Sequence, residues 1–147
     1  QVSTFTECAE AGNPIMESYP RQCRTQGGET FKEDIGNELE KDNLIRISEP
    51  RPNAFVTSPL TVKGMARGNW FFEASFPIKL LDGNGKALAQ GVAQTRADWM
   101  TTEFVPFEAT ISFALPTTTT GTLFLNKDNP SGLPENDGAL RVPIRFK

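Results

Sequence analysis

From Leu44 to the end of the chain, bulky apolar residues recur at every second position, which is the period of a half-buried β-strand. The longest run covers 105–115, where the apolar side chains alternate with residues such as Glu108 and Thr110. The same period is found in 45–48, 60–67, 70–81, 87–94, 122–127 and 139–147. No helical period separates these segments, so we expect about seven strands in roughly 100 residues.

A tight turn joins two of these predicted strands. The residues of Asp82–Gly85 (DGNG) favour a hairpin, because Gly and Asn tolerate the positive φ angles that such a turn requires. The strand after the turn carries small residues that can oppose the large ones before it, as a close-packed core needs. Together the patterns predict an all-β fold, an immunoglobulin-like antiparallel β-sandwich of about seven strands over 44–147.

The first 43 residues have a different character, and we place a domain boundary at Asn43. Gly, Pro and Asn interrupt short apolar pieces in 1–29, which is typical of a small turn-rich module. In 30–43, Thr30 and Glu33 have the spacing of a capping box. Three apolar residues there are spaced four apart, as on one face of a helix: Phe31, Ile35 and Leu39. We expect one short helix in this segment, with an irregular linker as the alternative.

Two cysteines, Cys8 and Cys23, are the only ones in the chain, and there is no histidine. Their separation is too large for a CxxC redox pair, and without histidine they cannot complete a common zinc site. We expect one disulfide that holds the N-terminal module, which indicates an oxidising compartment outside the cytoplasm. Two buried free thiols are the alternative.

The net charge is −3, but it is unevenly distributed, with −5 in 1–43 and +2 in 44–147. Neither part has the dense basic patch that a nucleic-acid-binding protein needs, so no nucleic acid partner is expected. No apolar run approaches the roughly 18 residues of a membrane span. The first residues lack the features of a signal peptide, and we expect any leader or lipid anchor to lie outside this chain.

Catalytic chemistry has little support in the sequence. A nucleophile cannot pair with histidine here, and strand alternation already explains Glu73 and Glu108 as outward-facing carboxylates. We therefore expect no enzyme and no cofactor, with a weak hydrolase as a distant alternative that would use paired carboxylates. The basic residues of 19–25 (YPRQCRT), beside a cysteine, leave a protease-inhibitor loop as another distant alternative.

Two acidic loops invite a calcium interpretation, because carboxylate and amide oxygens are the ligands that calcium prefers. The candidate ligands are Asp82, Asn84, Asp128 and Asp137. Asp and Asn are also good turn formers, and neither loop has the spacing of an EF-hand. We therefore expect no metal site.

Five of the eleven aromatic residues after Asn43 fall on inward faces and are expected in the core: Trp70, Phe72, Phe76, Phe107 and Phe113. Three others are out of phase or lie in a connecting segment: Phe71, Trp99 and Phe104. An exposed cluster of these three would form a contact surface for a protein or a glycan. The alternative is that they cover the core.

The segment Leu44–Phe146 resembles the immunoglobulin-like domain of the bacterial spore-germination protein family. The motifs that carry the resemblance are SPL, G-x-A-x-G-x-WFFE, FP, the D-x-x-G turn, DWM, FVPFEAT, KDNPSG and a closing V-P-I-R-F. The upstream segment is similar, over a shorter span, to a cysteine-bounded module of bacterial envelope proteins. The resemblance implies that this part of the chain is an accessory, non-catalytic domain of a secreted or lipid-anchored protein. The family has no established catalytic residues that could be assigned to this sequence.

The resemblance and the residues together predict a non-catalytic interaction or structural module of the bacterial cell envelope, located outside the cytoplasm. Its expected partner is a protein or a cell-envelope polymer, and the chain itself is expected to be monomeric. A glycan- or peptidoglycan-binding domain that uses exposed aromatics is the alternative function.

Overall fold

The computed structural model describes residues 2–128, 133 and 138–146. The chain forms two compact units, Gln1–Ile35 and Gly36–Lys147. The division thus lies before the boundary expected at Asn43, because the segment after Gly36 makes its hydrogen bonds with the larger unit. For example, the Asn37 side-chain amide donates to Ala139 O over 2.9 Å.

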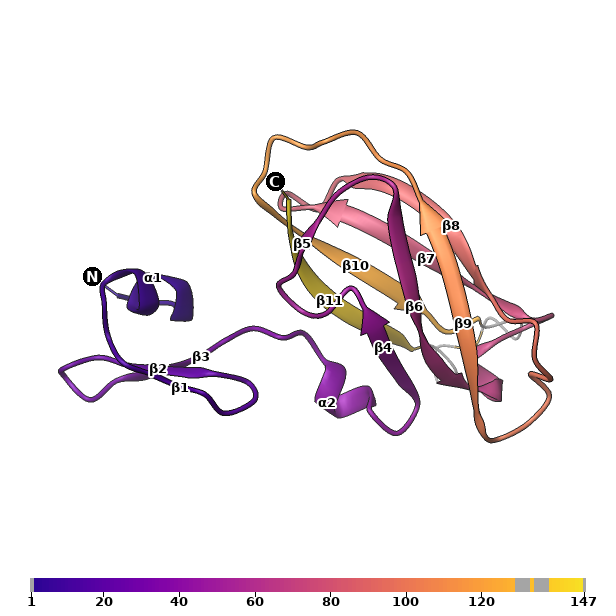
Figure 1. The fold of residues 1–147 in the computed structure, drawn as a ribbon, viewed down its shortest axis with the longest axis horizontal. Coiled ribbons are helices and arrows are strands. Elements are labelled where there is room, and N and C mark those ends of the chain that lie inside the picture. The colour runs from indigo at the N-terminus through magenta and orange to yellow at the C-terminus, as the bar shows by residue number, and fades with distance from the viewer. Residues whose placement is uncertain (1, 129–132, 134–137, 147) are drawn as a thin grey trace. The chain divides into compact units, whose positions relative to one another are not determined.

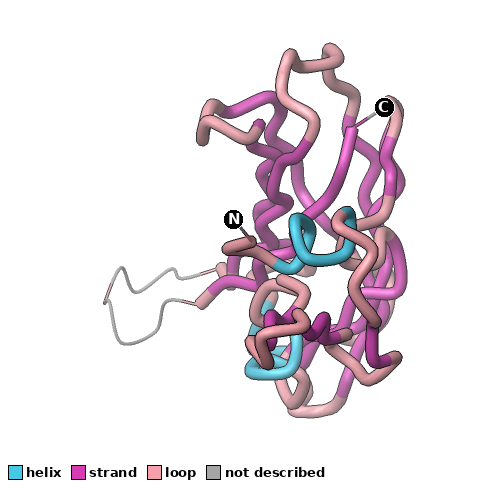
Figure 2. The backbone as a smooth tube through the Cα atoms, turned by 90° about the vertical axis from the view of Figure 1, so that its left-hand side faces the viewer, coloured by secondary structure: helices cyan, strands magenta, loops and turns pink. Residues whose placement is uncertain are grey.

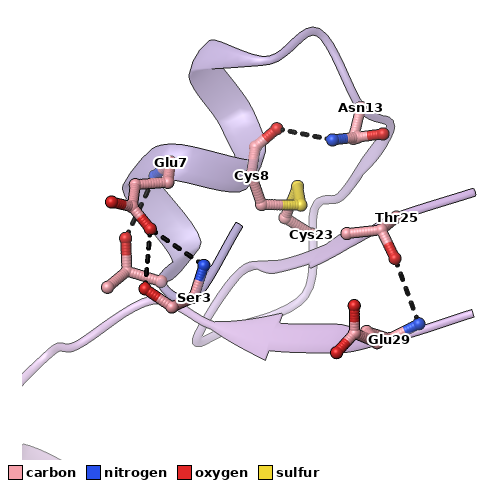
Figure 3. The surroundings of a disulfide bond; sticks show 8 residues. Ser3, Glu7, Cys8, Asn13, Cys23, Thr25 and Glu29 are labelled. Carbon is pink, nitrogen blue, oxygen red and sulfur yellow. Dashed lines mark hydrogen bonds between the residues drawn. A yellow bond between two sulfur atoms is a disulfide. The ribbon is translucent and has the colours of Figure 1, made fainter. Parts of the chain in front are cut away.

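The smaller unit contains one short helix and a three-stranded antiparallel sheet of order β1-β2-β3. Its elements are α1 (Phe5–Glu10), β1 (Ile15–Met16), β2 (Gln22–Arg24) and β3 (Thr30–Lys32). The expected disulfide is confirmed: it joins Cys8 on α1 to Cys23 on β2, and both residues are fully buried (Figure 3). The disulfide therefore fastens the helix to the middle strand of the sheet.

Helix α1 begins with a side-chain cap that the sequence contains but that we did not predict. Thr4 Oγ1 accepts from the backbone N–H of Glu7 over 3.1 Å. The Glu7 carboxylate in turn accepts from both the backbone N–H and the hydroxyl of Ser3, each over 2.8 Å (Figure 3). These hydrogen bonds from Ser3 lower the pKa of the Glu7 carboxyl.

The helix predicted from Thr30 onward is wrong over most of its length. Residues Thr30–Lys32 form strand β3, in which Phe31 pairs with Cys23 of β2. Helix α2 covers Glu38–Lys41 alone, and Gly36 precedes it with a φ of +76°. A side chain at Gly36 would overlap the carbonyl oxygen of Arg141, so the backbone makes a glycine-specific turn there in place of a helix.

The larger unit confirms the predicted immunoglobulin-like β-sandwich (Figure 1). Its elements are β4 (Ile45–Glu49), β5 (Phe55–Val56), β6 (Leu60–Arg67), the 3₁₀ turn η1 (Gly68–Trp70), β7 (Ser75–Asp82), β8 (Ala87–Gln94), β9 (Phe104–Ile111), β10 (Thr120–Asn126) and β11 (Ala139–Phe146). The strand order is β4-β6-β9-β8-β7-β10-β11-β5. All neighbours are antiparallel except β11 and β5, which are parallel and depart from the all-antiparallel prediction.

The sheet turns back on itself between β8 and β9, where a single residue pair, Gln94 with Glu108, joins the strands. The sheet therefore has two layers, β4-β6-β9 and β8-β7-β10-β11-β5 (Figure 1). Figure 2 shows how little helix accompanies the strands and loops of the chain. Inward-facing side chains of both layers form one buried core, in which the ring centroids of Phe76 and Phe107 lie 5.0 Å apart.

Strand β6 needs a glycine where it passes β4 and the core. A Cβ atom at Gly64 would lie 2.7 Å from Phe107 Cζ and would overlap the carbonyl oxygen of Arg46. Backbone and a core ring would both have to move, because neither is the flexible end of a side chain.

We expect Gly64→Ala to lower the free energy of unfolding of the larger unit by about 1–3 kcal/mol, the usual range for overpacking. Urea unfolding followed by tryptophan fluorescence measures this unit alone, since Trp70 and Trp99 both belong to it. The control is Met65→Ala, at the next residue of β6, whose side chain is exposed and whose loss should change the free energy by about 0.5 kcal/mol or less. Equal effects of the two variants would contradict the argument from close approach.

We expect a variant with Cys8→Ser and Cys23→Ser to unfold the smaller unit. On the loop-entropy model a disulfide closing such a loop stabilises by about 3 kcal/mol, and units below about 40 residues usually depend on such bonds. Amide NMR should show loss of dispersion for 2–35. The urea midpoint measured by tryptophan fluorescence should stay unchanged. A lower midpoint in the variant would contradict the division into separate units.

Candidate functional site

Phe72 and Trp99 meet at the surface of the larger unit, and the exposed Met100 follows Trp99 in the chain. We call these three residues the aromatic patch. Phe72 follows the turn η1, and Trp99 and Met100 lie in the loop between β8 and β9. The rings of Phe72 and Trp99 meet edge to face, with centroids 6.3 Å apart and planes at 65°. This contact brings the two segments together on the surface.

A strained turn holds Phe72 in place. The backbones of Phe72 and Ser75 exchange two hydrogen bonds, of 2.8 and 3.2 Å. The two residues between them, Glu73 and Ala74, have φ values of +51° and +66°, where glycine or asparagine is usual. The Thr95 N–H donates to Ala74 O over 3.0 Å and ties the turn to the end of β8. The side chain of Phe72 is left 41% exposed.

Side-chain hydrogen bonds fix the loop that carries Trp99. The N–H groups of Ala97, Met100 and Glu103 each donate to the side-chain oxygen two residues earlier, over 3.0–3.2 Å. A Cβ atom at Gly68 would overlap the carbonyl oxygens of this loop, so the loop packs directly on the backbone of η1. Trp99 packs partly against the core, whereas Met100 is 76% exposed.

The aromatic patch has the properties of a contact surface. Exposed aromatic and methionine side chains that lie together on a fixed backbone are typical of protein interfaces, because methionine adapts its shape to a partner. Two exposed acidic residues, Glu73 and Asp98, adjoin the patch in sequence. The patch is therefore apolar at its centre and acidic at its border.

Phe71 is not part of this surface, contrary to our expectation. It is only 3% exposed and packs edge to face on Phe76, with centroids 5.2 Å apart. The expectation for Phe72 is reversed in the same way, since it lies on the surface. The cause is η1: a 3₁₀ turn has no period of two, so the in-and-out order read forward from Trp70 shifts by one residue.

Phe104 lies at the start of β9 and is half-buried. The guanidinium carbons of Arg46 and Arg67 lie over its ring, 4.6 and 4.1 Å from the centroid. Arg67 also donates to the carbonyl oxygens of Asn43 and Thr102. The ring is therefore engaged within the fold and stabilises the packing of β4, β6 and β9.

The calcium candidates behave as turn residues where the structure describes them. The Asp82 carboxylate accepts from the N–H groups of Asn84 and Lys86, each over 2.9 Å, which closes the predicted hairpin turn. The Asp128 N–H donates to Trp70 O, and Asp137 lies outside the described residues. Within 2–128, 133 and 138–146, no group of three acidic, histidine or cysteine side chains could hold a metal ion.

One carboxylate, that of Glu38, is buried, and no sequence pattern predicted it. It forms an ion pair with Arg51, with Oε1–Nη1 at 2.6 Å. Arg51 also donates from Nη1 to Ile47 O over 2.7 Å. The pair therefore connects α2 to β4. The spacing of apolar residues in 30–43 carries no information about such an ion pair.

One of the two arginines in the segment considered for a protease-inhibitor loop, Arg21, is bound within its own unit. It donates from Nε and Nη2 to the two carboxylate oxygens of Glu33, over 3.2 and 2.8 Å, and it lies 5.3 Å from the Phe5 ring centroid. The hydrogen bonds from Arg21 to Glu33 raise the pKa of Arg21. This side chain thus holds β3 to the segment before β2.

Comparison with known proteins gives one match. A family model described as the immunoglobulin-like domain of bacterial spore germination matches residues 44–133. No curated protein and no solved structure matches the chain. Among the helices that the structure describes, none is long and apolar enough to cross a membrane.

We expect Trp99 to account for nearly all quenching of tryptophan fluorescence, because Trp70 is 1% exposed. Acrylamide should quench part of the emission, and Trp99→Phe should remove that part. Relative to the quenching of free N-acetyltryptophanamide by the same ion, caesium should quench Trp99 more strongly than iodide, because Glu73 and Asp98 attract cations and repel anions. Stronger quenching by iodide would contradict the acidic border of the patch.

Proposed function

The chain belongs to the family of the immunoglobulin-like domain of bacterial spore germination, and on that basis we propose that it is a non-catalytic interaction module of the bacterial cell envelope. The observation that carries the proposal is the aromatic patch. It places Phe72, Trp99 and Met100 on the surface of a rigid sandwich, which is how many binding domains present a contact surface.

The disulfide supports a location outside the cytoplasm. Both sulfur atoms of Cys8 and Cys23 are buried and bonded to each other in the smaller unit. Such structural disulfides persist in oxidising compartments and are rare in the bacterial cytoplasm, where thiols are kept reduced. The proposed module therefore works in the envelope or beyond it.

A protein is a better fit to the patch than a glycan. Sugar rings stack on flat, exposed aromatic faces, but Trp99 is partly buried and meets Phe72 at 65°. The two rings therefore do not form a continuous platform. Phe104, which could have extended one, is engaged by Arg46 and Arg67. Exposed methionine and phenylalanine beside acidic residues instead suit a polypeptide surface with apolar and basic side chains.

The proposal can be tested with immobilised protein and a detergent extract of bacterial envelopes. We expect a bound protein to be retained by the wild type and lost, by more than about tenfold, from a variant with Phe72→Ala and Trp99→Ala, because central aromatic contacts usually dominate interface energy. Leu115→Ala removes an apolar side chain that is more exposed than Phe72 and lies elsewhere in the sequence, and this variant should retain the partner.

Soluble peptidoglycan fragments, titrated against the same three proteins, separate the two functions. Binding of the fragments by the wild type and Leu115→Ala, with loss of binding in the Phe72→Ala, Trp99→Ala variant, would show that the ligand of the patch is a glycan and not a protein. Retention of the same partner by the Phe72→Ala, Trp99→Ala variant would show that the patch is not the contact surface.

A further inference from the structure

Two edges of the sandwich, one at β4 and the other at β11 with β5, are covered or shortened by specific features of the chain. The side-chain amide of Asn37 donates to Ala139 O over 2.9 Å and accepts from the Arg141 N–H over 2.7 Å, so it pairs with β11 as a strand would. Asn53 and β5 cover the rest of that edge. Strand β4 has a bulge and the Arg51 guanidinium on its outer carbonyl, and β5 is only two residues long. These are common protections against unwanted strand pairing.

Strand β8 has much less protection. Its sequence, ALAQGVAQ, contains no charged residue and no proline. These residues usually prevent unwanted pairing at an edge strand. It pairs with β7 along its length, with a bulge at Leu88, but with β9 only through Gln94. Among the described residues, no hydrogen bond to the backbone of Ala87–Val92 comes from outside the β7 ladder. About half of its N–H and C=O groups therefore face away from β7 without a protein partner.

A groove of about 550 Å³ opens where β8 and β9 diverge. Its walls include Val92 and Arg96 on one side and Glu108 and Thr110 on the other. A volume of roughly 300–1,000 Å³ is usual for a ligand site. Six residues from Ala87 to Val92 offer an edge about 20 Å long that ends in this groove.

The groove carries one acidic and one basic side chain, Glu108 and Arg96, and Glu108 is the one that lies in register with β8. Glu108 is exposed, and within the described part of the chain it forms no ion pair, even with Lys63, its neighbour in register on β6. Val92 is 51% exposed and lines the same wall two residues before Gln94, the register partner of Glu108. A basic side chain on an added strand, opposite Val92, would therefore lie beside the Glu108 carboxylate.

We propose that the free edge of β8, from Ala87 to Val92, binds an extended segment of another polypeptide by strand addition, with a basic residue of that segment held by Glu108 in the groove. Backbone hydrogen bonds to β8 provide the affinity, as in other cases of strand addition, and Glu108 selects the charge. This site is separate from the aromatic patch and does not depend on the function proposed for it.

Two capped hexapeptides test the proposal: Lys-Thr-Val-Thr-Val-Lys and Glu-Thr-Val-Thr-Val-Glu. The alternation of Thr and Val favours an extended strand, and the same charge at both ends makes the test independent of strand direction. Amide NMR of the full chain is followed during titration. We expect shifts centred on 87–92 and an affinity about two- to fivefold higher for the lysine peptide, as for an exposed ion pair.

Three variants complete the experiment. Glu108→Gln should remove the preference for lysine while binding persists, and Glu103→Gln, an exposed acidic residue in the loop before β9, should leave the preference intact. Val92→Lys should abolish binding of the lysine peptide, because a charge on the edge opposes strand addition. All three positions are exposed, so folding is retained.

Several results would overturn the proposal. One is the absence of shifts in 87–92 at millimolar peptide, and another is a set of shifts centred on the aromatic patch. Equal affinities of the two peptides for the wild type would remove the role of Glu108. Concentration-dependent shifts of β8 without any peptide, together with a doubled mass in sedimentation, would assign the edge to a second copy of the chain instead.

Discussion

The larger unit depends on burial between its two layers. Neither layer can cover its own apolar face, and among the described strands a single ladder pair, Gln94 with Glu108, joins the two layers. The layers are therefore held together mainly by side chains, above all by the contact of Phe76 on β7 with Phe107 on β9. Burying apolar surface is the largest favourable term in folding, and here it also determines which residues remain outside to meet a partner.

The alternating pattern predicted the sandwich because each long strand has one buried face. Strand β9 shows this most clearly, with Val105, Phe107, Ala109 and Ile111 buried and the three residues between them exposed. The smaller unit was less predictable. Its strands have two or three residues, too few to show a period, and α1 depends on a cap at Thr4 and on a disulfide to a distant strand. Contacts that are distant in sequence, more than local preference, fix such short elements.

The candidate site was predicted only in part for a related reason. Trp99 was named as a contact residue because it lies in a connecting loop, and the structure places it beside the exposed Phe72. Phe71 and Phe72 were interchanged because η1 and the turn at Glu73 and Ala74 reset the order of inward and outward positions. Neither feature has a sequence signal, since the two residues with positive φ are not those that usually adopt it. Strain at a surface turn commonly accompanies function, and this turn is what presents Phe72.

The same weak junction between β8 and β9 has a consequence for the protein in storage. Separating the layers on this side breaks one residue pair, whereas separating β10 from β11 breaks a ladder of seven. We therefore expect local unfolding of the sandwich to begin between β8 and β9, because local opening favours the region with the fewest backbone hydrogen bonds. Each opening exposes apolar core residues beside an uncharged edge strand. We therefore expect slow aggregation of concentrated protein to start there.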